Sequence, residues 1–131
     1  MSKTVAVIGA NGFVGSVLSR SAKNAGLCVL NVSRVNYQYT KNNSSNIDVV
    51  INTAMPSGRF AAKNNPAKDF SETVEKTFNI KNDFSLSKIV QISSISAKVQ
   101  LDTAYGRHKL SAEGLLNPET CLLYTSDAAD E

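Results

Sequence analysis

The fold of this chain is decided by residues 4–15, which read TVAVIGANGFVG. A strand-like run rich in β-branched side chains ends at Gly9, and Gly12 and Gly15 follow at three-residue intervals. β-Branched residues favour strands, and glycines permit the positive φ of a tight turn. The stretch therefore predicts a strand, a turn and the beginning of a helix.

A turn of this kind predicts a phosphate-binding site. Glycines lack the Cβ atoms that would keep a phosphate away from backbone N–H groups, and a helix N-terminus offers unpaired donors at the positive end of its dipole. The predicted contacts come from the turn and the helix start: Gly9, Asn11, Gly12, Phe13, Val14 and Gly15. The alternative is a strand-turn-helix whose glycines serve only to turn the chain.

The following segments alternate between helical and strand-like patterns. Apolar residues at helical spacing predict a helix over about 13–25, which Gly26 ends. The apolar run 27–32 is typical of a strand covered on both faces of a parallel sheet. We therefore expect an α/β fold that begins with a βαβ unit.

Further elements are expected downstream. The polar segment 35–46 predicts an abbreviated crossover or a brief edge element, 47–54 a buried strand and 55–64 a loop. Asn65 and Pro66 predict a helix start, and a stripe formed by Phe70, Val74 and Phe78 is expected in the core. A polar turn at 81–83, a strand at 88–92 ending at two serines and a helix at 103–116 complete the expected elements.

Two strand ends carry candidate cofactor contacts. Ser33 and Arg34 follow the second strand, where an acid would bind a ribose 2′-OH and an arginine accommodates a 2′-phosphate. We therefore expect NADP rather than NAD, the alternative being a solvated loop cation. Asn52, Thr53 and Ala54 end the next strand, where small residues leave room for a ribose or nicotinamide. Ordinary strand-end capping is the alternative there.

A second group of residues predicts acid/base chemistry. Tyr105 and Lys109 are four residues apart and share one helical face, although such a pair often marks only an exposed face. An ammonium close to a phenol lowers the tyrosine pKa from about 10, so the phenol can exchange a proton with a substrate. Ser93 and Ser94 end a parallel strand, and a serine hydroxyl there would hydrogen-bond the same substrate oxygen.

Composition narrows the function classes. The chain has 131 residues, of which 42% are hydrophobic, so we expect one small domain. A scattered net charge of +3 argues against a nucleic-acid partner, and no apolar stretch approaches a membrane span. The first strand follows Met1 too closely for a signal peptide, so we expect a cytoplasmic protein. Cys28, Cys121 and the one histidine, His108, predict no metal site or disulfide framework.

Taken together, four stretches resemble the extended short-chain dehydrogenase/reductase family, in its NAD(P)-dependent sugar-nucleotide epimerase, dehydratase and reductase branch. They are the glycine turn, residues 48–54, residues 92–94 and residues 105–110. The resemblance covers about residues 3–120 and implies a Rossmann-like doubly wound parallel sheet. It implies that Tyr105 is the catalytic acid/base, that Lys109 binds the nicotinamide ribose, and that Ser94, or failing it Ser93, orients the substrate oxygen.

The resemblance also implies an activity. It is that of an NAD(P)-dependent oxidoreductase, epimerase or dehydratase acting on a hydroxyl or carbonyl carbon, expected to be that of a nucleotide sugar, in a protein expected to form a homodimer. The chain departs from the pattern at Thr73, where the family often has asparagine, and in the short interval from Ser94 to Tyr105. A non-catalytic NAD(P)-binding sensor or scaffold is the alternative.

The end of the chain does not fit the family pattern. Residues 121–131 read CLLYTSDAADE, which resembles the translation of a transposon-end adapter used in DNA sequencing libraries. We therefore expect residues 1–120 to be a Rossmann domain that is incomplete at its C-terminus, and residues 121–131 to be a non-native tail. The chain by itself is then expected to be inactive. A natural acidic terminus is the alternative.

Overall fold

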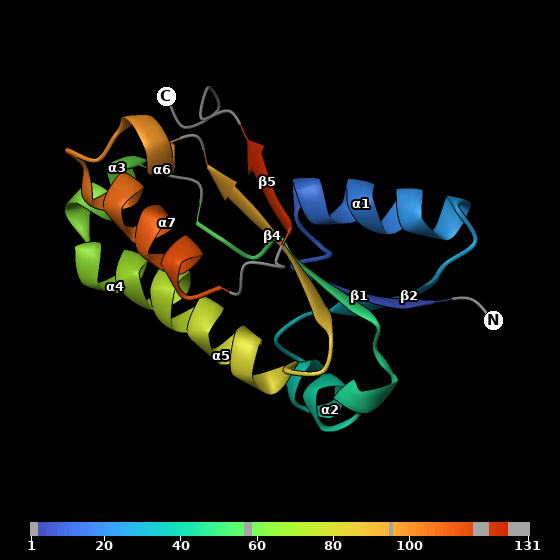
Figure 1. Cartoon of the computed structure of the whole chain (residues 1–131). Helices are drawn as coiled ribbons and strands as arrows, with labels where there is room; N and C mark the ends of the chain where they lie inside the picture. The colour runs from blue at the N-terminus through green and yellow to red at the C-terminus, as the bar shows by residue number, and fades with distance from the viewer. Residues whose placement is uncertain (1–2, 57–58, 95, 117–120, 126–131) are drawn as a thin grey trace. The chain divides into compact units, whose positions relative to one another are not determined.

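The computed structural model describes residues 3–56, 59–94, 96–116 and 121–125 (Figure 1). Its strands form one sheet in the order β2-β1-β3-β4-β5. Their bounds are β1 Thr4–Ile8, β2 Cys28–Val32, β3 Val49–Asn52, β4 Lys88–Ser94 and β5 Cys121–Thr125. β1 pairs in parallel with β2 and with β3, and β3 pairs in parallel with β4. The expected Rossmann-like α/β fold class is confirmed.

Helices connect most of these strands. They are α1 Phe13–Asn24, α2 Tyr37–Asn42, α3 Arg59–Asn64, α4 Pro66–Phe70, α5 Lys76–Asp83, α6 Ser96–Val99 and α7 Ala104–Gly114. A 3-10 turn, η1, covers Ser44–Asn46, and a π-helical turn, η2, covers Ser71–Glu75. None of the described helices has the length and apolar character needed to cross a membrane. By its internal contacts the chain divides into two compact units, residues 1–54 with 83–91 and residues 55–82 with 92–131.

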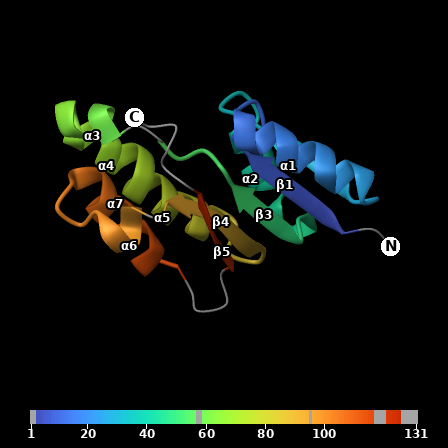
Figure 2. The ribbon, with the colours of Figure 1, turned by 90° about the horizontal axis from the view of Figure 1, so that it is seen from above.

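The first unit is built on β1. Val5, Ala6 and Val7 are buried in it, and the strand is hydrogen-bonded to β2 on one side and to β3 on the other. α1 lies along β1 and β2, which Figures 1 and 2 show from two directions. The buried residues of α1 are the small Gly15 and Ser19, so the helix backbone can approach the sheet closely.

The expectation that residues 27–32 form a strand covered on both faces is wrong. β2 forms as expected, but of its residues only Val32 is buried, and Leu30 is 39% exposed. β2 stands at the edge of the described sheet, paired with β1 alone, because the chain next crosses to β3 on the other side of β1. An apolar run shows that a strand can be buried, but the elements packed against its two faces decide whether it is.

The abbreviated crossover expected at 35–46 contains only α2 and η1. Tyr37 of α2 anchors it, because its hydroxyl donates to Asp83 Oδ2 at 2.6 Å and its ring meets Phe84 edge-on with centroids 5.8 Å apart. Lys41 pairs with the same carboxylate at 3.5 Å. A short helix of polar residues is thus held mainly by side chains far away in sequence.

In the second unit, α7 runs beside the continuous helical segment formed by α4, η2 and α5 (Figure 2). The predicted start of that segment is confirmed, since Asn65 Oδ1 accepts from the backbone N–H of Lys68 at 3.2 Å and Pro66 is the first helical residue.

The core stripe expected from Phe70, Val74 and Phe78 is wrong. Val74 is buried, but Phe70 is 43% and Phe78 50% exposed. The buried face carries instead the residues one position earlier and their helical neighbours: Asp69, Thr73, Thr77 and Ile80. Apolar spacing misled here because the buried face of this segment is largely polar, and because η2 interrupts the regular helical phase on which the stripe was counted.

Three expected boundaries also change. The loop expected at 55–64 contains α3, and the polar turn expected at 81–83 belongs to α5, which ends at Asp83. Residues 121–125 of the expected tail form β5, whereas residues 126–131 lie outside the described part of the chain. That this tail is not native stays a prediction.

Replacing Tyr37 with phenylalanine should lower the free energy of unfolding by about 1 kcal/mol at pH 8, because a hydrogen bond to a carboxylate is lost. Burial, followed by the hydrogen bond to Asp83, raises the pKa of Tyr37 above its usual value. The unfolded chain therefore loses this proton first, so the stabilisation is present below about pH 10 and falls as pH rises further.

Urea unfolding of the wild type and Tyr37→Phe at pH 8 and about pH 11 measures this difference. The difference in the free energy of unfolding between the two proteins should be smaller at the higher pH. Tyr39→Phe is the matched control, because Tyr39 lies on the same helix and is 72% exposed. A gap of equal size at both pH values would contradict the prediction.

Candidate functional site

The glycine turn after β1 is held by its own backbone. Gly9 has a φ of +85°, and its carbonyl accepts from the N–H of Gly12 at 3.0 Å. A Cβ at Gly9 would lie 2.7 Å from Thr53 Oγ1 and 3.0 Å from the backbone nitrogen of Ala54. Both the conformation and the space therefore require glycine at this position.

Gly15 has a different reason to lack a side chain. It lies in the first turn of α1, and a Cβ there would clash with the Gly9 carbonyl and lie 2.8 Å from Thr53 Oγ1. By contrast, a Cβ at Gly12 would lie 3.4 Å from the Gly9 carbonyl oxygen. The helix start is thus packed directly on the end of β1, as the sequence pattern predicts for a phosphate turn.

The N-terminus of α1 is suited to an anion. Its N-cap is Gly12, which has no side chain that could accept a hydrogen bond from the free N–H groups. The first turn holds no acidic residue. Phe13 and Val14 begin the helix, so their N–H groups have no intrahelical acceptor, and Asn11 and Gly12 beside them are exposed. These donors, at the positive end of the helix dipole, can bind a phosphate.

The end of β3 lies against this turn. Thr53 Oγ1 is within hydrogen-bond distance of the carbonyls of Ile8, at 2.7 Å, and Gly9, at 3.2 Å. Ala54 donates its N–H to Asn52 Oδ1 at 3.1 Å, and the Asn52 side chain is fully buried. Because the strand order is β2-β1-β3-β4, the chain leaves β1 toward β2 and leaves β3 toward β4, in opposite directions. The carboxyl ends of β1 and β3 therefore form a switch point, at which open α/β sheets bind ligands.

The two residues after β2 differ in their surroundings. Ser33 donates its N–H to Asn36 Oδ1 at 2.8 Å, and Asn36 in turn donates to the Asn31 carbonyl at 2.8 Å, which fixes the turn. Arg34 is exposed, and it forms no ion pair with any other described residue. This position is compatible with phosphate binding and also with a solvated cation.

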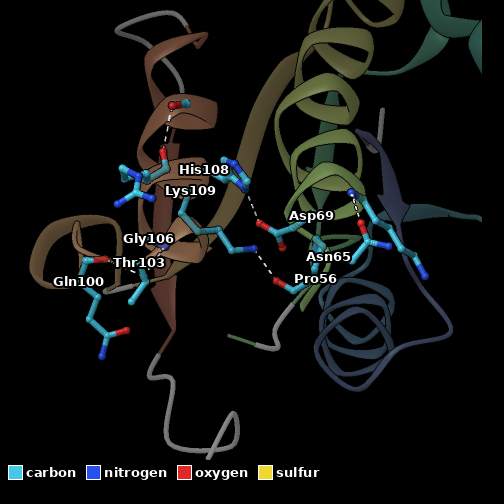
Figure 3. Close-up of polar contacts among 11 residues, drawn as sticks. Pro56, Asn65, Asp69, Gln100, Thr103, Gly106, His108 and Lys109 are labelled. Atoms are coloured by element: carbon cyan, nitrogen blue, oxygen red, sulfur yellow. Dashed lines mark hydrogen bonds and ion pairs between the residues drawn. The ribbon is translucent and has the colours of Figure 1, made fainter. Parts of the chain in front are cut away.

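In the second unit, α7 carries the predicted Tyr105 and Lys109 on one face. Both residues are 2% exposed, and Lys109 Nζ lies 5.0 Å from the centre of the Tyr105 ring. The same ammonium donates to the carbonyl of Pro56 at 2.5 Å, as Figure 3 shows. The pair is therefore not an exposed helix face but a buried ammonium beside a phenol ring, in a geometry that favours a cation–π contact.

Local features place α7. Thr103 caps it by accepting from the N–H of Gly106 at 3.0 Å, and its hydroxyl donates to the Gln100 carbonyl at 2.8 Å (Figure 3). A Cβ at Gly106 would lie 2.7 Å from the Ser96 carbonyl oxygen. The helix can lie this close to α6 only because residue 106 is glycine.

The two serines of β4 have different partners. Ser94 is 1% exposed, and its Oγ accepts from the N–H of Ser96 at 3.1 Å. Ser93 donates its hydroxyl to Glu113 Oε2 at 2.7 Å. Ser93 is thus tied to the far end of α7.

Sequence reasoning missed a buried pair in this unit. Asp69 of α4 is 5% exposed, and its Oδ2 lies 2.6 Å from His108 Nδ1 (Figure 3). Phe70 meets the His108 ring edge-on. The pair ties α4 to α7 next to Lys109. Helical phase gave no signal for it, because an aspartate was not expected on a buried face.

Thr73 also occupies a notable position. It stands at the position where the family that this chain resembles often has asparagine. Its side chain is fully buried in the π-helical turn η2. Its Oγ1 has no hydrogen-bond partner among the described residues. Within the same described residues, no group of three or more His, Cys, Asp or Glu side chains could hold a metal ion.

Residues 5–118 match the family model described as the NAD dependent epimerase/dehydratase family. None of the curated proteins compared with the chain matches it significantly.

Solved structures resemble it in fold. The dTDP-4-dehydrorhamnose reductase of Clostridium acetobutylicum has a TM-score of 0.80 and 20% sequence identity, over 92% of this chain and 52% of that one. The dTDP-4-dehydrorhamnose reductase of Bacillus anthracis, solved with NADP, has a TM-score of 0.83 and 18% identity, over 96% and 54%. MoeE5, solved with UDP-glucose and NAD, has a TM-score of 0.76 and 22% identity, over 94% and 52%. The chain spans about half the length of these structures.

Replacing Gly15 with alanine should destabilise the protein by about 1–3 kcal/mol, because the new Cβ would overlap the Gly9 carbonyl. The matched control is Gly114→Ala at the end of α7, where a Cβ would meet nothing within 4 Å. The control should be neutral or stabilising, since alanine favours a helix more than glycine does. Thermal unfolding of both variants measures the difference, and equal melting temperatures would contradict the prediction.

Proposed function

We propose that this chain, which belongs to the NAD dependent epimerase/dehydratase family, is part of an enzyme that transfers hydride between a bound NAD(P) and a hydroxyl- or carbonyl-bearing carbon. The observation that carries this proposal is the buried Lys109 ammonium beside the Tyr105 ring on α7. A lysine is rarely buried without a specific partner. Because the chain belongs to a family of NAD-dependent enzymes, we propose a catalytic role for this pair.

The residues present fit the cofactor. Gly9 and Gly15 lack a Cβ and so allow the turn to pack closely against the ends of β1 and β3, and α1 begins with N–H groups that can bind the pyrophosphate. Asn11, Gly12, Phe13 and Val14 would contribute backbone contacts there. Thr53 and Ala54, which lie against the same turn, would border the bound dinucleotide.

Different side chains of this chain would have different roles in the reaction. The bound nicotinamide supplies or accepts the hydride. Tyr105 would give a proton to the substrate oxygen during reduction and take one from it during oxidation. Lys109 would bind the nicotinamide ribose and favour the phenolate, and Ser94 would hold the substrate oxygen in line with Tyr105. Ser93 is the less suitable serine, since its hydroxyl is bound to Glu113.

The substrate class follows from the same proposal. Two similar structures are dTDP-4-dehydrorhamnose reductases, and MoeE5 was solved with UDP-glucose, so we propose a nucleotide sugar as substrate. The proposal covers reduction, epimerisation and dehydration alike. We also expect the complete enzyme to be a homodimer and to be cytoplasmic.

Replacing Tyr105 with phenylalanine in the complete enzyme should lower kcat by at least about a hundredfold, because the general acid/base is lost. The affinity for NAD(P) should stay within about twofold, since phenylalanine keeps the ring. Tyr39→Phe is the control, because Tyr39 is exposed on α2. Unchanged turnover in Tyr105→Phe would contradict the catalytic role and favour a non-catalytic cofactor-binding protein.

The preference for NADP depends on Arg34. Titration of the protein with each cofactor should show tighter binding of NADP than of NAD. Arg34→Ala should weaken NADP by about tenfold, the value of a charge-assisted contact to a phosphate, and leave NAD unchanged. Arg20→Ala serves as the control, because Arg20 is an exposed arginine of α1. Tighter binding of NAD by the wild type would refute the preference.

A further inference from the structure

Two amide side chains face each other inside the sheet of the first unit. Asn52 ends β3 and Gln91 lies opposite it on β4, in register. Asn52 is 0% and Gln91 1% exposed, and Asn52 Nδ2 donates to Gln91 Oε1 at 3.0 Å. An amide pair buried this deeply is stable only when its donors and acceptors are correctly oriented.

The contact with Gln91 fixes which way the Asn52 amide points. With Nδ2 toward Gln91, Asn52 Oδ1 points toward Ala54 and accepts its backbone N–H at 3.1 Å. If the amide were rotated by half a turn, its NH₂ group would face the Ala54 N–H, and two donors would oppose each other. The acceptor on Gln91 therefore favours the orientation that holds Ala54.

Ala54 is in turn close to the glycine turn. A Cβ at Gly9 would lie 3.0 Å from the Ala54 nitrogen and 3.1 Å from its Cα, so the two backbones nearly touch. Between Asn52 and Ala54, the Thr53 hydroxyl lies 3.2 Å from the Gly9 carbonyl, which also accepts from Gly12. A chain of contacts thus runs from β4 through the end of β3 to the turn.

We propose that Gln91 is a positioning residue for the phosphate turn, acting through Asn52 and the segment 53–54 on the geometry that receives the cofactor pyrophosphate. This inference rests on the proposed function, since it assigns the turn to a dinucleotide. Asn52 then acts from within the sheet by orienting Ala54, rather than by direct contact with the ribose or nicotinamide.

Stability alone does not require this pair. Replacing both members of a buried hydrogen bond by apolar groups of the same shape can be nearly neutral, so an apolar pair would serve a purely structural purpose. The amides add a direction that apolar groups lack. Through its oxygen, the Asn52 amide orients the backbone of Ala54. That backbone lies so close to Gly9 that there is no room for a methyl group on Gly9.

Binding of two ligands to the full chain tests the inference. NADP carries the pyrophosphate, whereas adenosine 2′-monophosphate carries the adenosine and the 2′-phosphate without it. Gln91→Met keeps the length of the side chain and removes the oxygen acceptor. It should weaken NADP by about three- to tenfold, the range of one net hydrogen bond, and leave adenosine 2′-monophosphate within twofold.

The matched control is Ser87→Ala. Ser87 donates its hydroxyl to the Ile47 carbonyl at 2.7 Å, which links the opposite, amino-terminal ends of the same two strands. This variant should lose stability without changing the ratio of the two affinities. Gln91→Glu keeps an oxygen facing Asn52 and should restore the wild-type ratio.

The outcomes separate the inference from the function on which it rests. No binding of NADP to the wild type would overturn both. Tight binding by the wild type with an unchanged affinity ratio in Gln91→Met, or the same change of ratio in Ser87→Ala, would overturn the inference alone. If Gln91→Met does not fold, hydrogen exchange of the Ala54 amide in the unmodified chain decides. It should slow with NADP but not with adenosine 2′-monophosphate, and equal rates with both ligands would overturn the inference.

Discussion

The absence of a side chain at Gly9 and Gly15 is the constraint on which the first unit depends. The Gly9 carbonyl lies where a Cβ of Gly15 would stand, and the backbone of Ala54 lies where a Cβ of Gly9 would approach. Three segments, from the ends of β1 and β3 and the start of α1, can therefore meet at one point. Their backbone N–H groups are placed there by close packing, which a rigid binding site for a phosphate requires.

The second unit contains buried ionisable side chains, Lys109 and Asp69. Lys109 is buried at a cost in solvation, and it recovers part of this through the Pro56 carbonyl and the Tyr105 ring. On the neighbouring residue, His108 meets the buried carboxylate of Asp69. Adjacent residues of α7 are thus held by two different segments, so the rotation of the helix about its axis is well defined.

Sequence patterns succeeded where the local backbone decides the structure. Glycine spacing, the Asn65 cap and the Tyr105–Lys109 interval each depend on a few consecutive residues, and each lies on the expected element. Patterns failed where distant partners decide. The 70–74–78 stripe, for example, is replaced by a largely polar buried face, because Asp69 has a partner 39 residues away. Periodicity counts apolar side chains and cannot register such a pair.

The sequence by itself determined the fold class, the glycine turn and the residues that place this chain in its family, because these follow from backbone conformation and short spacings. Only the tertiary structure decided that β2 is an exposed edge and that Lys109 is buried. It alone showed that the Asn52 amide is buried and donates to Gln91. Burial and hydrogen-bond direction depend on which strands and helices become neighbours, and long-range contacts set that choice.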